Sequence, residues 1–273
     1  MGEHMSQNDD DNLMLKERLK TIKKKFVVLS GKGGVGKSTV SVNIACALAA
    51  KGFKTGLLDV DVHGPSVPTM LGLTGAKLVS TDKGIIPAEI GCIPNLKVLS
   101  VGFLLGEKDA PVVWRGPMKA GAIKQFIKDV EWGELDYLIV DCPPGTGDEP
   151  LSAIQLLDNP DGAVLVTTPQ EVSAADVRRS VNFCKMLNLP VAGIIENMSG
   201  FACPKCGEVY DIFGKDGGEK IAKDYGINFL GKIPIEPELG KCGDAGIPYV
   251  NRADSHASKI FTHVADVLTE LNK

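Results

Sequence analysis

The chain has 273 residues, 44% of them hydrophobic and 23% charged, which is the balance of a globular protein and excludes disorder over most of its length. Thirty Lys and Arg residues against 34 Asp and Glu give a net charge of −4, so no broad cationic field is available to hold a nucleic acid. No apolar run reaches the ~20 residues of a membrane span and no signal-peptide pattern opens the chain. We therefore expect a cytoplasmic protein with neither a nucleic acid nor a membrane as partner.

The beginning of the chain differs in composition from the rest. Residues 1–12 are polar and acidic, which predicts a disordered tail. Leu13, Leu15, Leu19 and Ile22 then recur at nearly helical spacing and predict a short amphipathic helix at the edge of the fold. Residues 13–273 contain no long linker and no internal repeat, so we expect a single domain there.

Strand-like apolar runs alternate with helix-length segments along the rest of the chain. In chain order, the pattern predicts a strand at 26–29, a helix at 37–51, strands at 55–58 and 96–101, a helix at 117–129, strands at 137–140 and 163–167, a helix at 173–187, strands at 191–195 and 229–233, and a last helix at 255–271 capped by Ser255. This alternation indicates an α/β fold with a mostly parallel central sheet and helices on both faces.

Residues 31–39 read GKGGVGKST and lie between an apolar strand and a helix, the context that the phosphate-loop pattern requires. Backbone N–H groups of such a loop converge on phosphate oxygens, the lysine before the final Ser-Thr bridges phosphates, and the following hydroxyl binds Mg²⁺. We therefore predict a single P-loop NTPase domain. Its nucleotide-binding residues are Gly31, Lys32, Gly33, Gly34, Val35, Gly36, Lys37, Ser38 and Thr39, with Ser38 also on Mg²⁺.

Lys32 is a second cation that an ordinary phosphate loop does not need. It is either a solvated lysine or a residue that reaches across a dimer interface and offsets charge on the partner's nucleotide, as an arginine finger does. The GKGGVGKST form resembles the deviant Walker A signature of the MinD, ParA and nitrogenase iron protein class, in which the additional lysine has that role. We predict catalytic roles for Lys32 and Lys37.

Three aspartates follow predicted strands. Asp59 and Asp61 end one strand and Asp141 ends another, and ligands gather at the carboxyl ends of strands in open parallel sheets. We predict that Asp141 holds Mg²⁺, mostly through water, and that Asp61 is catalytic and either orients the attacking water or relays the hydrolysis state. The alternative is that these residues only cap the next helix. Residues 143–148 (PPGTGD) form a candidate switch loop beside the γ-phosphate.

Cys203 and Cys206 form a CxxC pair within a candidate metal loop at residues 200–210. Two thiolates are half of a site, because zinc tetrathiolate and [4Fe-4S] centres both take four sulfur ligands. A twofold dimer would supply the other half, and Lys32 acting across an interface needs the same dimer. A redox dithiol and a structural zinc clip are the competing interpretations. Cys46 and Cys184 lie in helical apolar patterns and are predicted to be buried.

The ordered set of motifs resembles the Mrp/ApbC family of iron-sulfur carrier ATPases. The motifs are the phosphate loop, DVDVHGPS (59–66), WRGPM (114–118), DCPPGTGDE (141–149), ENMS (196–199) and CPKCG (203–207). The resemblance implies a homodimeric ATPase that binds ATP and Mg²⁺, holds a labile [4Fe-4S] cluster between subunits and passes it to apo iron-sulfur proteins. It also implies that Asn197 binds the adenine and that residues 234–239 line the base. Residues 1–25 have neither the length of the extra domain nor the cysteines of the second cluster that some relatives carry, so we do not expect functions that need those parts.

Two other functions stay open at this stage. A MinD-like positioning ATPase would want a basic amphipathic tail, but the chain ends on mixed charge. A targeting ATPase bridged by structural zinc would keep the same dimer, because a four-thiolate site accepts zinc as well as iron.

Overall fold

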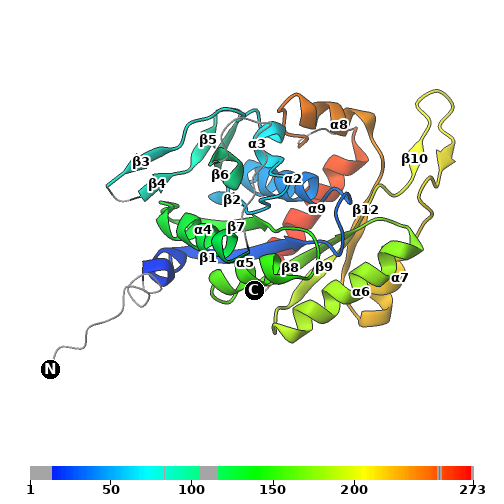
Figure 1. The fold of residues 1–273 in the computed structure, drawn as a ribbon. Helices are drawn as coiled ribbons and strands as arrows, with labels where there is room; N and C mark the ends of the chain where they lie inside the picture. Colours follow the sequence, from blue (N-terminus) through cyan, green and yellow to red (C-terminus); the bar gives the residue numbers. More distant parts are fainter. Residues whose placement is uncertain (1–13, 83, 105–115, 251, 253, 272–273) are drawn as a thin grey trace.

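The computed structural model describes residues 14–82, 84–104, 116–250, 252 and 254–271. The predicted tail at residues 1–12 and the first two residues of the WRGPM motif lie outside these ranges. Within them, the chain forms the predicted α/β architecture, with one large sheet between two helical layers (Figure 1).

The sheet has eight strands in the order β12-β9-β8-β1-β7-β2-β6-β5. All neighbours pair in parallel except β5, an antiparallel edge strand. The strands are β1 (Ile22–Leu29), β2 (Thr55–Asp59), β5 (Ala88–Ile90), β6 (Ile93–Ser100), β7 (Leu135–Asp141), β8 (Gly162–Thr167), β9 (Val191–Asn197) and β12 (Phe229–Ile233). The mostly parallel sheet predicted from the apolar runs is confirmed.

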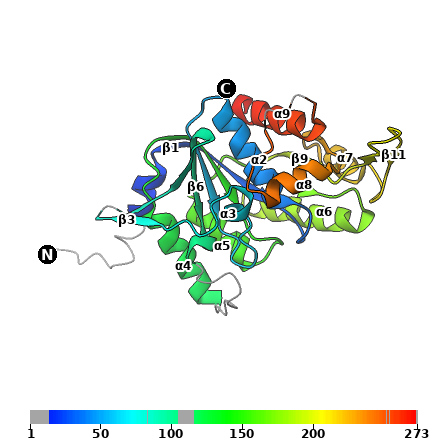
Figure 2. The ribbon, with the colours of Figure 1, turned by 90° about the horizontal axis from the view of Figure 1, so that it is seen from above.

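Helices cover both faces of the sheet, as predicted. One hydrophobic cluster joins the sheet to α2 (Lys37–Ala50), α3 (Val67–Met70), α8 (Pro237–Asp244) and α9 (His256–Glu270). The other joins it to residues 14–19, α4 (Gly116–Asp129), α5 (Asp148–Leu156), α6 (Glu171–Met186) and α7 (Gly217–Tyr225). Figure 2 shows α2 running beside α9 over the sheet. Helix α2 is buried almost all round because it packs against both α9 and the sheet.

Several predicted boundaries change. Ile22 was expected in the first helix but begins β1 and pairs with Leu135, because extending the strand buries its side chain in the sheet. Val101 was expected in a strand and instead opens a 3-10 turn, η1 (Val101–Phe103). The Ser255 cap is confirmed, since its hydroxyl accepts a hydrogen bond from the Ser258 N–H at 2.9 Å. Cys46 and Cys184 are fully buried, as predicted.

Two small hairpins were not predicted from the sequence. One pairs β3 (Val79–Thr81) with β4 (Gly84–Ile86), and the other pairs β10 (Phe201–Ala202) with β11 (Val209–Tyr210). The second hairpin carries the two cysteines at its turn and projects from the body of the fold beyond β9 and α7 (Figure 1). Its strands are too short and too exposed to produce an apolar run.

Candidate nucleotide site and cysteine hairpin

The phosphate loop connects the carboxyl end of β1 to the first turn of α2. Gly34 and Gly36 adopt positive φ angles of 78° and 80°, which only glycine adopts without strain. A Cβ on Gly36 would also clash with Nδ2 of Asn197, so the loop can approach the end of β9 only without a side chain there. The predicted glycines therefore give the loop its shape at the helix N-terminus, where phosphate oxygens are favoured.

Lys37 is buried at the start of α2 and faces two of the predicted aspartates. Its ammonium lies 2.7 Å from Asp141 Oδ1 and 3.6 Å from Asp61 Oδ2. Burial lowers the pKa of Lys37, but the charge and hydrogen bond of Asp141 outweigh that effect and the net pKa is raised. The structure thus brings together two strand ends and the phosphate loop around one cation.

Asp141 is held by one of its two oxygens only. Oδ1 accepts from Lys37 and from the Ser41 hydroxyl, which lies 2.7 Å away. Oδ2 is buried and has no hydrogen-bond partner in the part of the chain that the structure describes. A buried carboxylate oxygen without a donor fits a cation or its bound water. The half-buried Ser38, a second possible ligand, follows Lys37 in the first turn of α2. The donor set therefore fits Mg²⁺.

Asp59 has a structural environment that differs from that of its neighbour Asp61. It is fully buried, accepts from the Ser100 hydroxyl at 2.7 Å and from the Asp61 N–H at 3.0 Å. Burial, followed by the nearby charge of Asp141, raises the pKa of the Asp59 carboxyl to about 8. Asp59 therefore acts as a support for the loop that presents Asp61.

Lys32 lies at the outer side of the phosphate loop. Its ammonium donates to Gln170 Oε1 at 3.3 Å, and Gln170 immediately precedes α6. Its carbonyl accepts from the Ser30 hydroxyl at 2.9 Å. The backbone of Lys32 is thus tied to the loop, while its ammonium is held by a neutral partner, Gln170.

The candidate switch loop lies against the phosphate loop. The Gly145 N–H donates to the Ser30 carbonyl at 2.8 Å. His63, in the loop after β2, lies with Nε2 3.0 Å from Glu149 Oε1 in the first turn of α5. The segments that follow β2 and β7 therefore meet beside the predicted γ-phosphate position.

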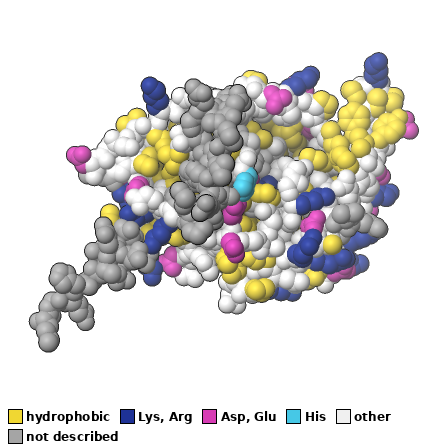
Figure 3. Space-filling model, in the orientation of Figure 1, with side chains coloured by type: hydrophobic (Ala, Val, Ile, Leu, Met, Phe, Trp, Pro, Cys, Tyr) yellow, Lys and Arg dark blue, Asp and Glu magenta, His cyan; other side chains and the backbone are white. Residues whose placement is uncertain are grey.

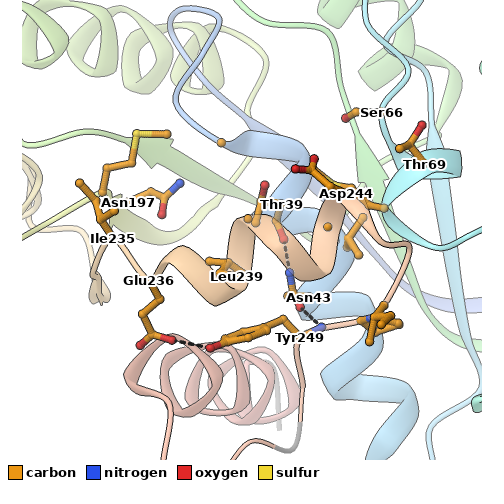
Figure 4. Close-up of a pocket in the computed structure, with 18 of the residues that line it drawn as sticks. Thr39, Asn43, Ser66, Thr69, Asn197, Ile235, Glu236, Leu239, Asp244 and Tyr249 are labelled. Atoms are coloured by element: carbon orange, nitrogen blue, oxygen red, sulfur yellow. Dashed lines mark hydrogen bonds between the residues drawn. The ribbon is translucent and has the colours of Figure 1, made fainter. Parts of the chain in front are cut away.

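A cavity of about 320 Å³ opens next to the phosphate loop. Thr39 and Asn197 point into it, and Ile235 and Leu239 supply apolar walls (Figure 4). Asn197 donates from Nδ2 to the Val35 carbonyl at 2.8 Å. The predicted base-lining stretch at 234–239 thus borders a cavity of suitable position and chemistry for a nucleotide base.

The far wall of this cavity includes Tyr249 and Asn43, which the sequence did not indicate. Glu236 accepts from the Tyr249 hydroxyl at 2.9 Å, and Asn43 accepts from the Tyr249 N–H at 3.1 Å (Figure 4). Ser41 and Gln170 were missed as well. Ser41 and Asn43 follow the phosphate loop in α2 but belong to no motif, whereas only the folded chain brings Gln170 and Tyr249 to this site.

Cys203 and Cys206 lie at the turn between β10 and β11. The Cys203 N–H donates to the Glu208 carbonyl at 2.9 Å, and the Gly207 N–H donates back to the Cys203 carbonyl at 2.8 Å. The Cys206 N–H, then the Lys205 N–H, hydrogen-bond the Cys203 sulfur and lower the pKa of that thiol. These contacts favour a thiolate, which is the form that binds a metal.

The hairpin is open to solvent. Val209 is 64% exposed, Tyr210 47% and Ile212 56%, and Figure 3 shows hydrophobic side chains gathered over it. No group of three or more Cys, His, Asp or Glu residues that could hold a metal occurs among the described residues. The described part of one chain therefore offers the metal two thiolates and an apolar surround, but not four ligands.

The sheet order, the phosphate loop and the carboxylates at its strand ends define a P-loop nucleotide-binding protein. The family described as ParA, NUBPL iron-transfer P-loop NTPase, matches residues 21–269, and the chain belongs to this family. None of the described helices is long and apolar enough to cross a membrane.

Similar proteins agree with this assignment. The iron-sulfur cluster carrier protein of Methanocaldococcus jannaschii is 51% identical over 94% of this chain and 87% of its own length. The cytosolic Fe-S cluster assembly factor NUBP2 homolog of Dictyostelium discoideum is 54% identical over 84% of this chain and 87% of its own.

Solved structures give the same fold. A nucleotide-binding protein from Archaeoglobus fulgidus in complex with ADP is 42% identical, has a TM-score of 0.76, and covers 86% of this chain and 91% of its own. The cell division protein MinD of Aquifex aeolicus is 25% identical with a TM-score of 0.65, over 90% of this chain and 97% of its own.

Proposed function

We propose that this protein is a cytoplasmic ATP-hydrolysing carrier that assembles a [4Fe-4S] cluster between two copies of the chain and transfers it to apo iron-sulfur proteins. The observation that carries the proposal is the pair of the half-buried Cys203 and the exposed Cys206, half of a four-thiolate site, on a chain with a phosphate loop. The family membership and the names of its relatives support iron-sulfur cargo.

The hydrolytic half of the proposal uses the residues around Lys37. Backbone N–H groups of the phosphate loop and Lys37 hold the β- and γ-phosphates, and Ser38 and Asp141 hold Mg²⁺, which offsets phosphate charge. Asp61 orients a water for attack on the γ-phosphorus. The bond to the β–γ bridging oxygen breaks, a proton of the attacking water passes to the released phosphate, and ADP and phosphate leave. Lys32 from the second copy stabilises the charge on the transferring group.

The nucleotide base fits the cavity beside α8. An asparagine amide offers both a donor and an acceptor to a purine edge, and the Asn197 carbonyl oxygen is free of the Val35 contact, which uses the Nδ2 group. Apolar walls from Ile235 and Leu239 suit the faces of a base. We infer that Asn197 binds adenine.

A second copy completes the cargo site. Twofold symmetry places two cysteine pairs around one axis, which gives the four sulfur ligands that a [4Fe-4S] cluster takes. The exposed Val209, Tyr210 and Ile212 flank the pair on the same projecting hairpin. Covering them with a second hairpin removes apolar surface from water and shields the cluster from solvent.

Anaerobic reconstitution with iron and sulfide tests the proposal. We expect about four irons per dimer, and loss of loading in Cys203→Ala/Cys206→Ala. Cys92→Ala is the matched control, because Cys92 is also exposed but is unpaired, and it should load fully. Iron loading that survives loss of the pair would reject the carrier, and zinc without iron in protein purified without oxygen would favour the zinc-bridged dimer instead.

A further inference from the structure

The segment that carries the cysteine hairpin is hydrogen-bonded at both of its ends to the same side chain of the sheet, that of Glu196. It begins after β9 and ends at the first turn of α7. Glu196 Oε1 accepts from the Ser199 hydroxyl at 2.6 Å, and Oε2 accepts from the Gly218 N–H at 2.7 Å. One carboxylate therefore joins the two ends of the segment from Ser199 to Gly218, which we call the cargo segment.

Burying the Glu196 carboxylate lowers the free energy of unfolding unless its hydrogen bonds compensate. The residue is fully buried in the sheet, and both of these donors are neutral. A buried charge without a cationic partner destabilises a core unless its hydrogen bonds compensate. The Gly218 N–H belongs to the N-terminal turn of α7, where a negative charge is favoured, so the carboxylate compensates for its burial by holding that turn.

The backbone of Gly218 approaches β8 and β9 so closely that a side chain at this position would be crowded. A Cβ on Gly218 would lie 3.0 Å from Thr167 Cγ2 and 3.3 Å from Glu196 Oε2. The beginning of the segment is tied as well, since the Ser199 N–H donates to the Ile233 carbonyl at 2.9 Å. The beginning of the cargo segment is therefore fixed to β9 and β12, and its end is fixed to β9.

We propose that Glu196 is the positioning residue of the cargo site: by tying Ser199 to Gly218 it fixes the base of the cysteine hairpin and so the direction in which Cys203 and Cys206 are presented. This inference rests on the proposed function, because it presumes that the pair binds a metal. A hairpin that pivots at its base moves the thiolates at its tip, and four thiolates from two copies must converge on one centre. Holding the base removes that freedom before the metal binds.

The test uses the reduced full-length protein and Co²⁺, whose thiolate charge-transfer absorption reports sulfur ligation. We expect Glu196→Ala and Ser199→Ala to weaken Co²⁺ binding roughly tenfold, the size of effect seen when groups that orient metal ligands are lost. Glu196→Gln should retain most of the affinity, because its amide oxygen can accept from Gly218 while its NH₂ group donates to the Ser199 hydroxyl.

Asp136→Asn is the matched control. Asp136 also accepts a backbone N–H, that of Lys54 at 2.8 Å, but it lies near the amino end of the central strand β7, whereas Glu196 lies near the carboxyl end of β9. We expect its Co²⁺ affinity to equal that of the unchanged protein even if its melting temperature falls. A purely structural role for Glu196 would instead lower melting temperatures and leave Co²⁺ affinity unchanged.

The outcomes separate this inference from the proposed function. Binding of Co²⁺ that requires the cysteines but is unaltered within about twofold in Ser199→Ala and Glu196→Ala would overturn the role of Glu196 alone. An unchanged sulfur-to-cobalt absorption in Cys203→Ala/Cys206→Ala would overturn both. Should Glu196→Ala fail to fold, Ser199→Ala decides, since it removes one hydroxyl and leaves the Gly218 contact.

Discussion

The Lys32 ammonium donates to Gln170 Oε1 within its own chain, at 3.3 Å. An arginine-finger role in a second copy requires the ammonium to exchange this neutral acceptor for phosphate oxygens of the neighbouring nucleotide. That exchange is favourable because a phosphate is charged and the amide is not. The lysine is thus held by a partner that a bound nucleotide can replace.

Mixing two inactive variants tests this transfer between copies. Lys32→Ala lacks the reaching cation and should lower ATP hydrolysis by at least about a hundredfold, and Lys37→Ala lacks the phosphate-binding lysine. In a mixed dimer, the Lys37→Ala copy supplies its Lys32 to the intact loop of the other. We expect about a quarter of the full rate on mixing, since half of the dimers are mixed and each has one complete site. If the mixture hydrolyses ATP no faster than the two variants do separately, Lys32 acts within its own chain.

Replacing Asp141 should separate magnesium binding from nucleotide binding. Its Oδ2 has no donor among the described residues, and Asp141→Asn exchanges a metal-binding carboxylate for an amide. We expect Mg²⁺ to stop tightening the binding of a non-hydrolysable ATP analogue in this variant, measured by calorimetry with and without the metal. Ser41→Ala, which removes only the hydroxyl on Oδ1, should keep a weakened magnesium effect. If Mg²⁺ tightens nucleotide binding as strongly in Asp141→Asn as in the unchanged protein, the metal is not held by this carboxylate.

Asn197→Ala should remove the preference for adenine. The variant loses the amide that faces the base cavity and leaves the Val35 carbonyl without its donor. We expect ATP affinity to fall roughly tenfold and the ratio of ATP to GTP affinity to approach one. Tripolyphosphate, which lacks a base, serves as the control ligand and should bind both proteins nearly equally. A retained adenine preference would exclude Asn197 from base recognition.

The raised pKa of Asp59 predicts a pH dependence of stability. The folded protein holds a proton on Asp59 up to about pH 8, whereas an unfolded carboxyl releases it near pH 4. The proton contributes stability that is fully present below pH 4 and is lost as the pH rises through 8. Within that window, the free energy of unfolding should fall by up to about 1.4 kcal/mol per pH unit from this group.

Asp59→Asn has no carboxyl proton to release at this position. Comparing its stability with that of the unchanged protein over a range of pH therefore isolates the contribution of Asp59. We expect the variant to gain on the unchanged protein in urea unfolding as the pH rises from 5.5 to 8, with nucleotide and metal omitted from both samples. Its amide oxygen can still accept from Ser100. Parallel stability curves for the two proteins would show that Asp59 is ionised in the fold.

Alkylation kinetics test the lowered pKa of Cys203. The Cys206 and Lys205 N–H groups stabilise its thiolate, so the thiolate persists to lower pH than in a free cysteine. We expect iodoacetamide to modify Cys203 in Cys206→Ala with an inflection below the ordinary thiol value near 8.5, read by peptide mass spectrometry. The exposed Cys92 is the internal reference. An inflection at or above the ordinary value would contradict the hydrogen-bonded thiolate.

The sequence alone predicted the long elements and the local motifs. Seven parallel strands were evident because most of them are buried apolar runs, and the phosphate loop was evident because its residues act together within nine positions. The short helices α7 and α8 and the β10–β11 hairpin were missed. They contain too few buried residues for a periodic pattern, and the packing of α7 on β9 and β12 and of α8 on α3 is visible only in the folded chain.

The Cys203 and Cys206 pair was also evident from spacing alone, since a tight turn brings such residues together whatever the rest of the chain does. Only the tertiary structure decided which distant side chains support these motifs. Asp141 meets Lys37 across 104 positions, Gln170 meets Lys32 across 138, and Glu196 joins two ends of one segment. Motif residues adjacent in sequence are recognisable because chain connectivity keeps them together, whereas these partners become neighbours only when parallel strands align their carboxyl ends at one edge of the sheet.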